Sequence, residues 1–400
     1  MKILMLTPYL PYPLLSGGQI RTYNLLKQLG KKHDITLFSL IKEDSEKQYI
    51  PELEKYCKKV SVFRRSQKPF TLRNIVKTLF SSYPFLVIRN HVPETISAIE
   101  KELSQDQYDL IHAETFYMMP HLPKTDVPVL LTEQTIEYLG YESYAKKASK
   151  LLQPLLNMDI DKIRRWERHY WEQCDTLVVM SEDDKKFISR TLGSPEKIEV
   201  VANGVDADWF NQKRRIFPDL PTILYVGTFK WLPNVEAVDF LVSKVWPLLK
   251  EKVANIRLKI VGNAPTARVL AYQTSDDSIE VQGRIPDIRD AFKQAHVLLA
   301  PVFSGKGTRY KILEAMASGT PVVATTIAVE GLGVVNGMHV VTDNTAEGMA
   351  TLVNKVLSDE KLWLKLSRNG HRFVTQHYDW QHISQTLDSI YIGMHKRLTQ

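Results

Sequence analysis

The stretch PVFSGKGTRYKILEAMASGTPVV, residues 301–323, carries the densest structural pattern of the chain. It predicts the end of a strand, a glycine-rich loop, a helix over 310–318 that stops at Gly319, and a second strand at 321–324. A strand, a crossover helix and another strand in this order form the repeating unit of a parallel sheet. The stretch therefore predicts a parallel α/β domain with a loop at the carboxyl end of a strand.

Short β-type runs alternate with helical stretches on both sides of this segment. A break near 203–220, rich in Asn, Gly, Asp and Pro, separates two such series. We therefore expect an α/β fold with two Rossmann-like, doubly wound domains, at 1–203 and 204–380, and a last helix at about 380–400 that packs back on the first domain. The expected strands are 2–7, 35–40, 59–63, 109–113, 128–132 and 175–180, then 223–226, 258–261, 279–281, 297–300, 321–324 and 339–341.

Length and composition agree with two soluble-type globular domains. The chain has 400 residues, of which 44% are hydrophobic and 24% charged, and a net charge of +7. Two cysteines, Cys57 and Cys174, cannot form a disulfide framework and indicate a reducing compartment. No apolar stretch approaches 18 residues, and no secretory signal is recognisable, so we expect a cytoplasmic protein whose membrane association, if any, is peripheral.

One window has a strong charge bias. Between Glu54 and Glu94 there are nine basic residues and no acidic one, with aromatic and leucine side chains interleaved. One interpretation is a basic-aromatic surface on an anionic membrane, using residues 55–93. The alternative is a solvated helix face whose aromatic residues lie in the core. Nucleic acid is not expected as a partner, because no recognition motif accompanies the window. The basic residues are Lys55, Lys58, Lys59, Arg64, Arg65, Lys68, Arg73, Lys77 and Arg89.

The glycine-rich loop at 304–309 has the composition of an anion site. Free backbone N–H groups at a helix N-terminus suit a diphosphate, and Arg309 and Lys311 would add charge-assisted contacts. Glu314, one turn further on, would accept hydrogen bonds from ribose hydroxyls. The alternative is a helix with a surface ion pair between Lys311 and Glu314, which leaves the glycines unexplained. The loop is not a Walker A sequence, since G-x-x-x-x-G-K-[ST] does not match.

A second glycine loop follows the first expected strand. Gly17 and Gly18 precede a helix expected to begin near Gln19, with Arg21 in its first turn. Such glycines let a phosphate or sugar approach backbone N–H groups, although a tight loop entering a helix would look the same. The G-x-G-x-x-G fingerprint is absent, which argues against NAD or FAD as a cofactor.

At the 301–323 segment the chain resembles family 4 of the retaining glycosyltransferases, which have the GT-B fold with a cleft between two domains. It is closest to the branch that reads G-T-R-x-K-x-L-E-A-x-A-x-G-x-P-V-V. Further segments agree in order along the chain, most densely over 200–345. They are Val200–Asp206, which resembles an interdomain P-N-G-V-D, then Tyr225–Asn234, Val261–Pro265 and Val281–Asp287, which resemble strand-end motifs.

The resemblance implies a role for each matched position. Glu314 matches the second Glu of the family's Glu-x7-Glu motif and should hold the donor ribose. Backbone near Arg284 and Ile285 should face the base, and Lys230 and Arg309 should supply charge beside the diphosphate. The other positions placed at the donor nucleotide are Gly17, Gly18, Gly227, Thr228, Gly307, Thr308, Tyr310 and Lys311.

Three positions depart from the family pattern. The first Glu of Glu-x7-Glu falls on Lys306, and Pro233 stands where the common G-R-x-x-x-x-K has its Lys. Many members have a second His in H-x-H after the fourth strand, where this chain has Glu114. Glu114 could contact the donor sugar or the acceptor, or cap the next helix. We take Glu114, Lys230 and Arg309 as the catalytic candidates.

No metal site is expected. Two Asp-x-Asp triplets, 159–161 and 206–208, resemble the metal motif of another glycosyltransferase fold. The first lies in an expected helix, where positions i and i+2 do not share a face, and the second follows Asn203 and Gly204. Both are expected to be surface or capping residues, and no His/Cys cluster has zinc spacing.

By resemblance we expect a metal-independent enzyme without a cofactor. It would move a sugar, with retention, from a nucleotide diphosphate sugar to a glycan or lipid-linked acceptor in bacterial cell-surface polysaccharide or glycoconjugate synthesis. UDP is the favoured donor nucleotide and GDP the next. The alternatives are a nucleotide-sugar 2-epimerase, which needs acid/base carboxylates, and a catalytically weak or inactive partner subunit.

Overall fold

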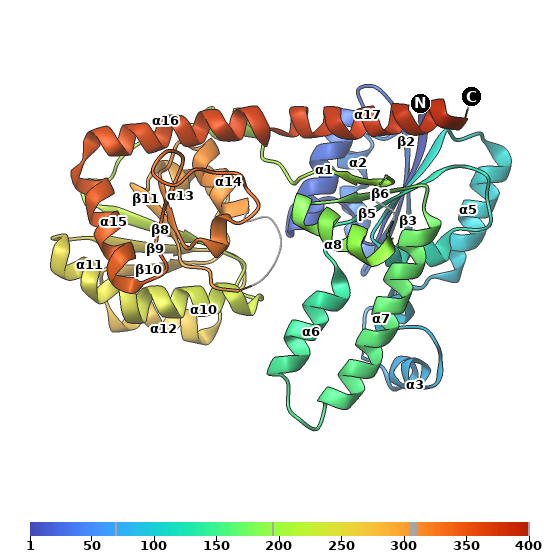
Figure 1. The fold of residues 1–400 in the computed structure, drawn as a ribbon, viewed down its shortest axis with the longest axis horizontal. Coiled ribbons are helices and arrows are strands. Elements are labelled where there is room, and N and C mark those ends of the chain that lie inside the picture. Colours follow the sequence, from blue (N-terminus) through green and yellow to red (C-terminus); the bar gives the residue numbers. More distant parts are fainter. Residues whose placement is uncertain (69, 194–195, 305–309, 399–400) are drawn as a thin grey trace. The chain divides into compact units, whose positions relative to one another are not determined.

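The computed structural model describes residues 1–68, 70–193, 196–304 and 310–398 (Figure 1). Two compact units divide the chain: Met1–Ala202 with Ile383–Gln400, and Asn203–His382. Each unit has one parallel sheet with helices between successive strands. The helix at the end of the chain, α17 (Trp380–Leu398), belongs to the first unit from Ile383 onward.

The first unit contains a seven-stranded sheet in the order β3-β2-β1-β4-β5-β6-β7, with every neighbouring pair parallel. Its central strands are continuous apolar runs because both faces of a parallel sheet are covered. The strands are β1 (Lys2–Thr7), β2 (Asp34–Ile41), β3 (Lys59–Arg64), β4 (Leu110–Glu114), β5 (Val129–Glu133), β6 (Thr176–Val179) and β7 (Ile198–Val200).

Helices of the first unit join these strands. Figure 1 shows α6 and α7 projecting as a hairpin, with α3 beside α7. The helices are α1 (Gly17–Leu29), η1 (Asp44–Tyr49), α2 (Ile50–Leu53), α3 (Leu72–Phe80), α4 (Phe85–Asn90), α5 (Pro93–Gln105), η2 (Phe116–His121), α6 (Glu137–Lys147), α7 (Gln153–Gln173) and α8 (Glu182–Leu192).

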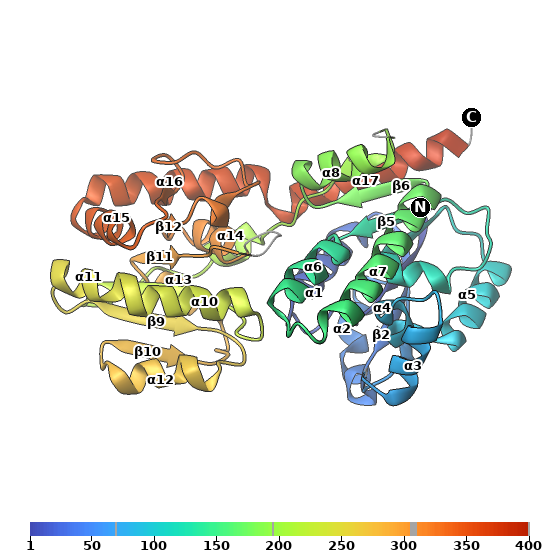
Figure 2. The same ribbon diagram turned by 60° about the horizontal axis from the view of Figure 1, so that its bottom comes forward.

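The second unit contains a six-stranded parallel sheet in the order β10-β9-β8-β11-β12-β13. In Figure 2, α12 (Ala267–Ser275) lies beside β10 at one edge of this sheet. The strands are β8 (Thr222–Val226), β9 (Arg257–Val261), β10 (Ile279–Gln282), β11 (Val297–Ala300), β12 (Val322–Ala324) and β13 (Val341–Thr342). The remaining helices are α9 (Ala207–Asn211), α10 (Leu232–Phe240), η3 (Leu241–Val245), α11 (Trp246–Lys252), α13 (Ile288–Lys293), α14 (Tyr310–Ala317), η4 (Ile327–Val329), α15 (Ala346–Ser358) and α16 (Glu360–His377).

Local sequence explains where the elements differ from expectation. Helix α1 begins at Gly17, earlier than Gln19, because the Ser16 hydroxyl caps it by accepting the Gln19 N–H. The sequence pattern predicts a single helix over 233–250, but the structure has three segments there, with a π turn at Leu241–Val245. Pro247, at the start of α11, has no N–H to donate to the preceding turn, so the α-helical hydrogen-bond register cannot continue through it.

Helix α17 is tied to the first unit by a buried carboxylate. Asp388 accepts hydrogen bonds from Lys32 Nζ at 2.6 Å and pairs with His33 Nε2 at 2.8 Å. Burial acts to raise the pKa of Asp388, but the contacts with Lys32 and His33 outweigh it and hold the pKa below its ordinary value. A carboxylate whose pKa is lower in the folded state than in the unfolded state stabilises the fold at neutral pH. This contribution is lost as the pH falls through the folded-state pKa.

We expect Asp388→Asn to lower the free energy of unfolding of the first unit at pH 7 by about 1–3 kcal/mol, because a charged hydrogen-bond acceptor is lost. Denaturant titration at pH 7 and again at pH 3 measures this, and the difference between variant and wild type should shrink at pH 3. Glu251→Gln is the matched control, since Glu251 is exposed on α11 and forms no ion pair with a described residue. An equal loss at both pH values would refute the electrostatic origin.

Candidate functional site

Glu114 ends β4 in the middle of the first sheet and is fully buried. Gln134, directly after β5, donates from Nε2 to Glu114 Oε2 at 2.7 Å. Among the described residues nothing donates a hydrogen bond to Glu114 Oε1. Burial raises the pKa of Glu114, while the charge of Arg21 and the Gln134 hydrogen bond act to lower it. One carboxyl oxygen is therefore held in place and the other is left for a ligand.

His112, two residues earlier on β4, is a neutral support for this carboxyl. Its Nδ1 lies 2.5 Å from Tyr391 Oη on α17, and its Nε2 lies 2.7 Å from Thr132 Oγ1. Burial, and then the charge of Arg21, lower the pKa of His112 to about 3. Although Nε2 is 3.6 Å from Glu114 Oε1, the imidazole is uncharged at neutral pH.

Gly17 and Gly18 are the first two residues of α1. A Cβ at Gly18 would collide with the Tyr9 hydroxyl and with Gln134 Oε1. Gln134 Nε2 also donates to Tyr9 Oη at 2.8 Å. Glycine is thus required at position 18 for the approach of Tyr9 and Gln134 to Glu114. The space beside Gly18 is filled by the side chains of Tyr9 and Gln134. The sequence interpretation, in which these glycines make room for a phosphate or sugar, did not include this packing.

Sequence reasoning missed two members of this group, Tyr9 and Gln134. Arg21, which the sequence placed in the first turn of the helix, is buried, and its Nη1 donates to Ala202 O at 2.8 Å. Tyr9 and Gln134 each follow a strand, β1 and β5, so the rule that ligand-binding residues follow parallel strands would have indicated both. The helix-capping alternative for Glu114 is wrong, because Thr115 takes the N-cap position of η2.

In the second unit, Lys311 of α14 points at β8 and α10. Its Nζ donates to Tyr225 Oη at 3.0 Å and to Asn234 Oδ1 at 2.9 Å, and lies 4.2 Å from the centre of the Tyr225 ring. Asn234 in turn donates to Thr228 O at 2.9 Å. Lys311 therefore braces the loop after β8, whereas the sequence suggested a diphosphate contact or a surface pair with Glu314.

Glu314 lies three residues after Lys311 on α14 and is partly exposed. Burial raises the pKa of Glu314 to about 7, and the charge of Lys311 acts in the opposite direction. No described residue donates a hydrogen bond to this carboxyl group. It is therefore a hydrogen-bond acceptor available to a ligand at the helix that follows β11.

The remaining donor candidates follow other strands of the same sheet. Gly227 and Thr228 come directly after β8 and are half-buried, while Lys230 is exposed in the same loop. Arg284 and Ile285 follow β10, with Arg284 exposed. All strands are parallel, so these loops and α14 share the carboxyl edge of the sheet. Gly307, Thr308 and Arg309, with Lys306, lie outside the described residues.

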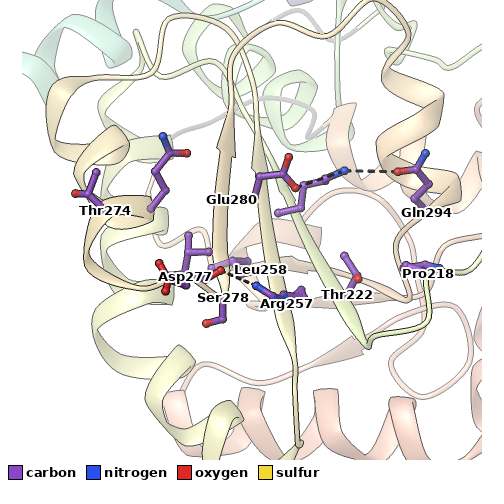
Figure 3. Close-up of a pocket in the computed structure, with 12 residues that line it drawn as sticks. Pro218, Thr222, Arg257, Leu258, Thr274, Asp277, Ser278, Glu280 and Gln294 are labelled. Carbon is purple, nitrogen blue, oxygen red and sulfur yellow. Dashed lines mark hydrogen bonds and ion pairs between the residues drawn. The ribbon is translucent and has the colours of Figure 1, made fainter.

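A hollow of about 680 Å³ lies at the opposite edge (Figure 3). Its lining includes Thr222, Arg257 and Ile279, which begin β8, β9 and β10. Arg257 Nη1 donates to Asp277 O at 2.6 Å across it. Ligands of doubly wound sheets bind at the carboxyl ends of the strands, so this hollow is not the candidate donor site.

Both Asp-x-Asp triplets have local roles. Asp159 Oδ1 accepts the N–H of Phe85 at 2.8 Å, at the start of α4, and Asp161 pairs with Arg164. Asp206 caps α9 by accepting the Trp209 N–H at 2.9 Å. Within the described ranges no three His, Cys, Asp or Glu side chains are grouped so that they could hold a metal ion.

The basic window 55–93 divides into two parts. Four of its basic residues form ion pairs on the sheet side: Lys55 with Glu52, Lys58 with Asp34, Lys59 with Glu102 and Arg64 with Asp44. The rest of the window includes an exposed amphipathic helix, α3, on which Leu72 is 78% and Phe80 87% exposed. We define the α3 surface as the exposed Phe70, Leu72, Ile75, Val76, Leu79, Phe80 and Tyr83 with Lys68, Arg73 and Lys77.

Phe70, Phe80 and Tyr83 are therefore not core residues, whereas Leu86 lies in the core of the first unit and Phe63 packs against it. The interpretation that placed the window's aromatic residues in the core thus holds for part of the window only. The α6–α7 hairpin adds more exposed apolar side chains at its tip: Tyr144, Leu151, Leu152 and Leu155. Figure 1 shows this tip and α3 at the same end of the first unit. No helix of the described chain is long and apolar enough to cross a membrane.

We expect Lys311→Met to lower the free energy of unfolding of the nucleotide-free protein by about 1–3 kcal/mol, because Tyr225 and Asn234 lose a charged donor. Thermal and denaturant unfolding without any ligand measure it. Lys361→Met on α16 is the control, since Lys361 is exposed and unpaired among the described residues. Unchanged stability would mean that the hydrogen bonds from Lys311 to Tyr225 and Asn234 do not stabilise the fold.

Two family models match consecutive parts of the chain: "Glycosyltransferase Family 4" over residues 15–209 and "Glycosyl transferases group 1" over residues 220–359. An uncharacterized 44.6 kDa protein in the cps region of Klebsiella pneumoniae is 20% identical over 390 residues, covering 94% of this chain and 96% of that protein. The UDP-Gal:alpha-D-GlcNAc-diphosphoundecaprenol alpha-1,3-galactosyltransferase of Escherichia coli is 20% identical over 328 residues, covering 75% and 79%.

Among solved structures, Alr3699/HepE of Anabaena in complex with UDP superposes with a TM-score of 0.67 at 15% identity, over 98% of this chain and 100% of that one. At 15% identity this superposition shows that the two proteins share a fold, whereas the two family models match the amino-acid sequence itself. Together with the two parallel sheets, these comparisons identify the chain as a family 4 glycosyltransferase of the GT-B fold, which transfers a sugar from a nucleotide sugar.

Proposed function

We propose that the protein transfers a sugar from a UDP-sugar, with retention at the anomeric carbon, to a lipid-linked glycan during synthesis of a bacterial cell-surface polysaccharide. The observation that carries this proposal is Glu314, a carboxyl group at the carboxyl edge of the second sheet to which no described residue donates a hydrogen bond. Two neighbours support the choice of donor and acceptor. Alr3699/HepE binds UDP, and the Escherichia coli relative uses UDP-Gal and a diphosphoundecaprenol-linked acceptor.

In the proposed donor complex, Glu314 accepts hydrogen bonds from the ribose hydroxyls. Backbone near Ile285 meets the base, with Arg284 beside it, and the α14 N-terminus with Tyr310 faces the diphosphate. Lys230 is exposed and unpaired among described residues, so it is available to the leaving diphosphate. Arg309, Gly307 and Thr308 are proposed to act at the same phosphates on the strength of the sequence motif. GDP is the second donor candidate.

In the proposed reaction the acceptor oxygen attacks the anomeric carbon as the bond to the nucleotide diphosphate breaks, on the same face of the sugar. The leaving phosphate takes the proton of the acceptor hydroxyl. Basic side chains and helix-end amides stabilise the departing charge, so the chemistry proposed needs no metal. Glu114 Oε1, which accepts no internal hydrogen bond from a described residue, would orient a hydroxyl of the donor sugar or of the acceptor.

We expect UDP to stabilise the wild-type protein against heat, with roughly 2.7 kcal/mol gained at 100 times its dissociation constant. Glu314→Ala should lose this shift because the ribose loses its acceptor, and Glu251→Ala should keep it. Thermal unfolding with UDP, GDP and ADP measures the effect and ranks the nucleotides. A shift that persists in Glu314→Ala would remove Glu314 from the site. The absence of a shift with every nucleotide would favour an inactive partner subunit.

A lipid-linked acceptor lies at a membrane, and we propose that the α3 surface docks there on anionic lipid. The exposed large apolar side chains of this short helix would insert at the boundary between headgroups and acyl chains, and Lys68, Arg73 and Lys77 would attract anionic headgroups. Each basic residue near such a surface contributes about 1 kcal/mol. The place of action would then be the cytoplasmic face of the cell membrane.

In liposome flotation we expect the wild type to float with vesicles containing anionic lipid and not with neutral vesicles. Leu72→Ser with Phe80→Ser should abolish flotation because the inserted apolar area is lost, and Arg73→Glu with Lys77→Glu should weaken it. Leu270→Ser on α12 is the control for an exposed leucine elsewhere. Flotation of the double serine variant at the wild-type level would contradict the proposal.

A further inference from the structure

Two arginines of the first unit lie close together without a carboxylate partner. Arg65 directly follows β3, and its Nη1 donates to Asn90 Oδ1. Arg89 lies near the end of α4, and its Nε is hidden from solvent without a hydrogen-bond partner among the described residues. Neither guanidinium forms an ion pair within the described part of the chain. Each side chain is partly exposed, so a ligand can reach the pair from solvent.

The surroundings neutralise this charge only in part. Burial is the main cause that lowers the pKa of Arg65, and the charge of Arg89 acts in the same direction, while Tyr117 and Glu46 act to raise it. Glu137, the first residue of α6, is close enough to respond to Arg89, yet burial raises the pKa of Glu137 to about 7. It is therefore partly protonated at neutral pH and offers only part of a counter-charge.

Tyr117 connects the arginines with the Glu114 group. Burial and then Glu137 raise the pKa of Tyr117 above its ordinary value, while the charges of Arg89 and Arg65 oppose them. Burial raises the pKa of Tyr9 as well, followed by the charges of Glu114 and Tyr117. Tyr117 thus lies within electrostatic range of both arginines and of Tyr9, the neighbour of Glu114. Arg65 follows β3, Glu114 ends β4 and Tyr117 follows β4, so these three lie toward the carboxyl edge of the first sheet.

A guanidinium keeps its proton under physiological conditions, so two such groups that are partly buried together repel each other. A partly buried charge is costly unless it is paired. Planar, forked donors match the oxygens of a phosphate and bind it with two parallel hydrogen bonds. An anion between Arg65 and Arg89 would remove the repulsion and satisfy the buried Nε.

We propose that Arg65 and Arg89 bind a phosphate or diphosphate group carried by the acceptor, with the Tyr117 hydroxyl as a further donor. This inference rests on the proposed function and names the acceptor's anionic class and its anchor. The anchor would hold the acceptor by its phosphate, while the hydroxyl to be glycosylated lies toward Glu114. The fold places this anchor in the first unit, separate from the Glu314 donor site in the second.

The test is isothermal titration of the full chain with inorganic pyrophosphate in saturating UDP, so that the donor diphosphate position is already filled. Wild type should bind pyrophosphate, and Arg65→Gln and Arg89→Gln should each bind it roughly tenfold or more weakly, the usual loss of a charged hydrogen bond. Arg89→Lys should fall between, because it keeps the charge and loses the fork. Arg190→Gln, at an exposed position of α8, should bind like wild type.

Equal pyrophosphate affinity in wild type and Arg89→Gln would overturn the proposal, as would no binding to wild type at millimolar pyrophosphate. UDP binding by each variant shows that the second unit, which contains Glu314, is folded, and circular dichroism with thermal unfolding shows whether the substituted first unit is folded as well. If UDP fails to bind wild type, the proposed function fails, and the pyrophosphate titrations without UDP still compare the variants. Loss of pyrophosphate binding only in the Arg65 and Arg89 variants supports the anchor in either case.

Discussion

Parallel pairing of the strands is the constraint on which the rest of this structure depends. Because every strand of a sheet runs in one direction, residues that follow different strands meet at one edge. Glu114 after β4 and Gln134 after β5 are twenty residues apart, yet they share a 2.7 Å hydrogen bond. In the second unit the same rule gathers the loops after β8 and β10 and the helix after β11, and leaves the hollow at the amino edge without these groups.

Burial then decides the charge of each group at these edges. A carboxyl group and an imidazole can lose their charge, so Glu114 and Glu314 have raised pKa values and His112 has a lowered one. A guanidinium cannot, and this is the reason for the proposal that Arg65 and Arg89 bind an anionic ligand. Lys311 is satisfied internally by Tyr225 and Asn234, which leaves Glu314 as the group of α14 open to a ligand.

Much of the fold could be predicted because strands and helices differ in period and are separated by Gly, Pro and Asn. The α/β class and the family were predicted correctly, and expected strands agree with observed ones within a few residues. The three-residue β7 was too short to recognise. The π turn before Pro247 was not predicted, because the helical periodicity of the sequence continues through it. At the site, Tyr9, Gln134 and Arg65 have no local motif, so only their position after a strand could have indicated them, and Arg89, in α4, lacks even that indication.

Local period and residues adjacent in the chain were enough to predict the two α/β series, the break between them and the family, and the family motifs selected Glu114 and Glu314 as candidates. Tertiary structure alone decided which charges are paired. It turned Lys311 toward Tyr225, separated the ion-paired half of the 55–93 window from the exposed α3 surface, and brought Arg65 beside Arg89. Charge pairing acts over a few ångströms in space, and spacing along the chain does not encode such distances.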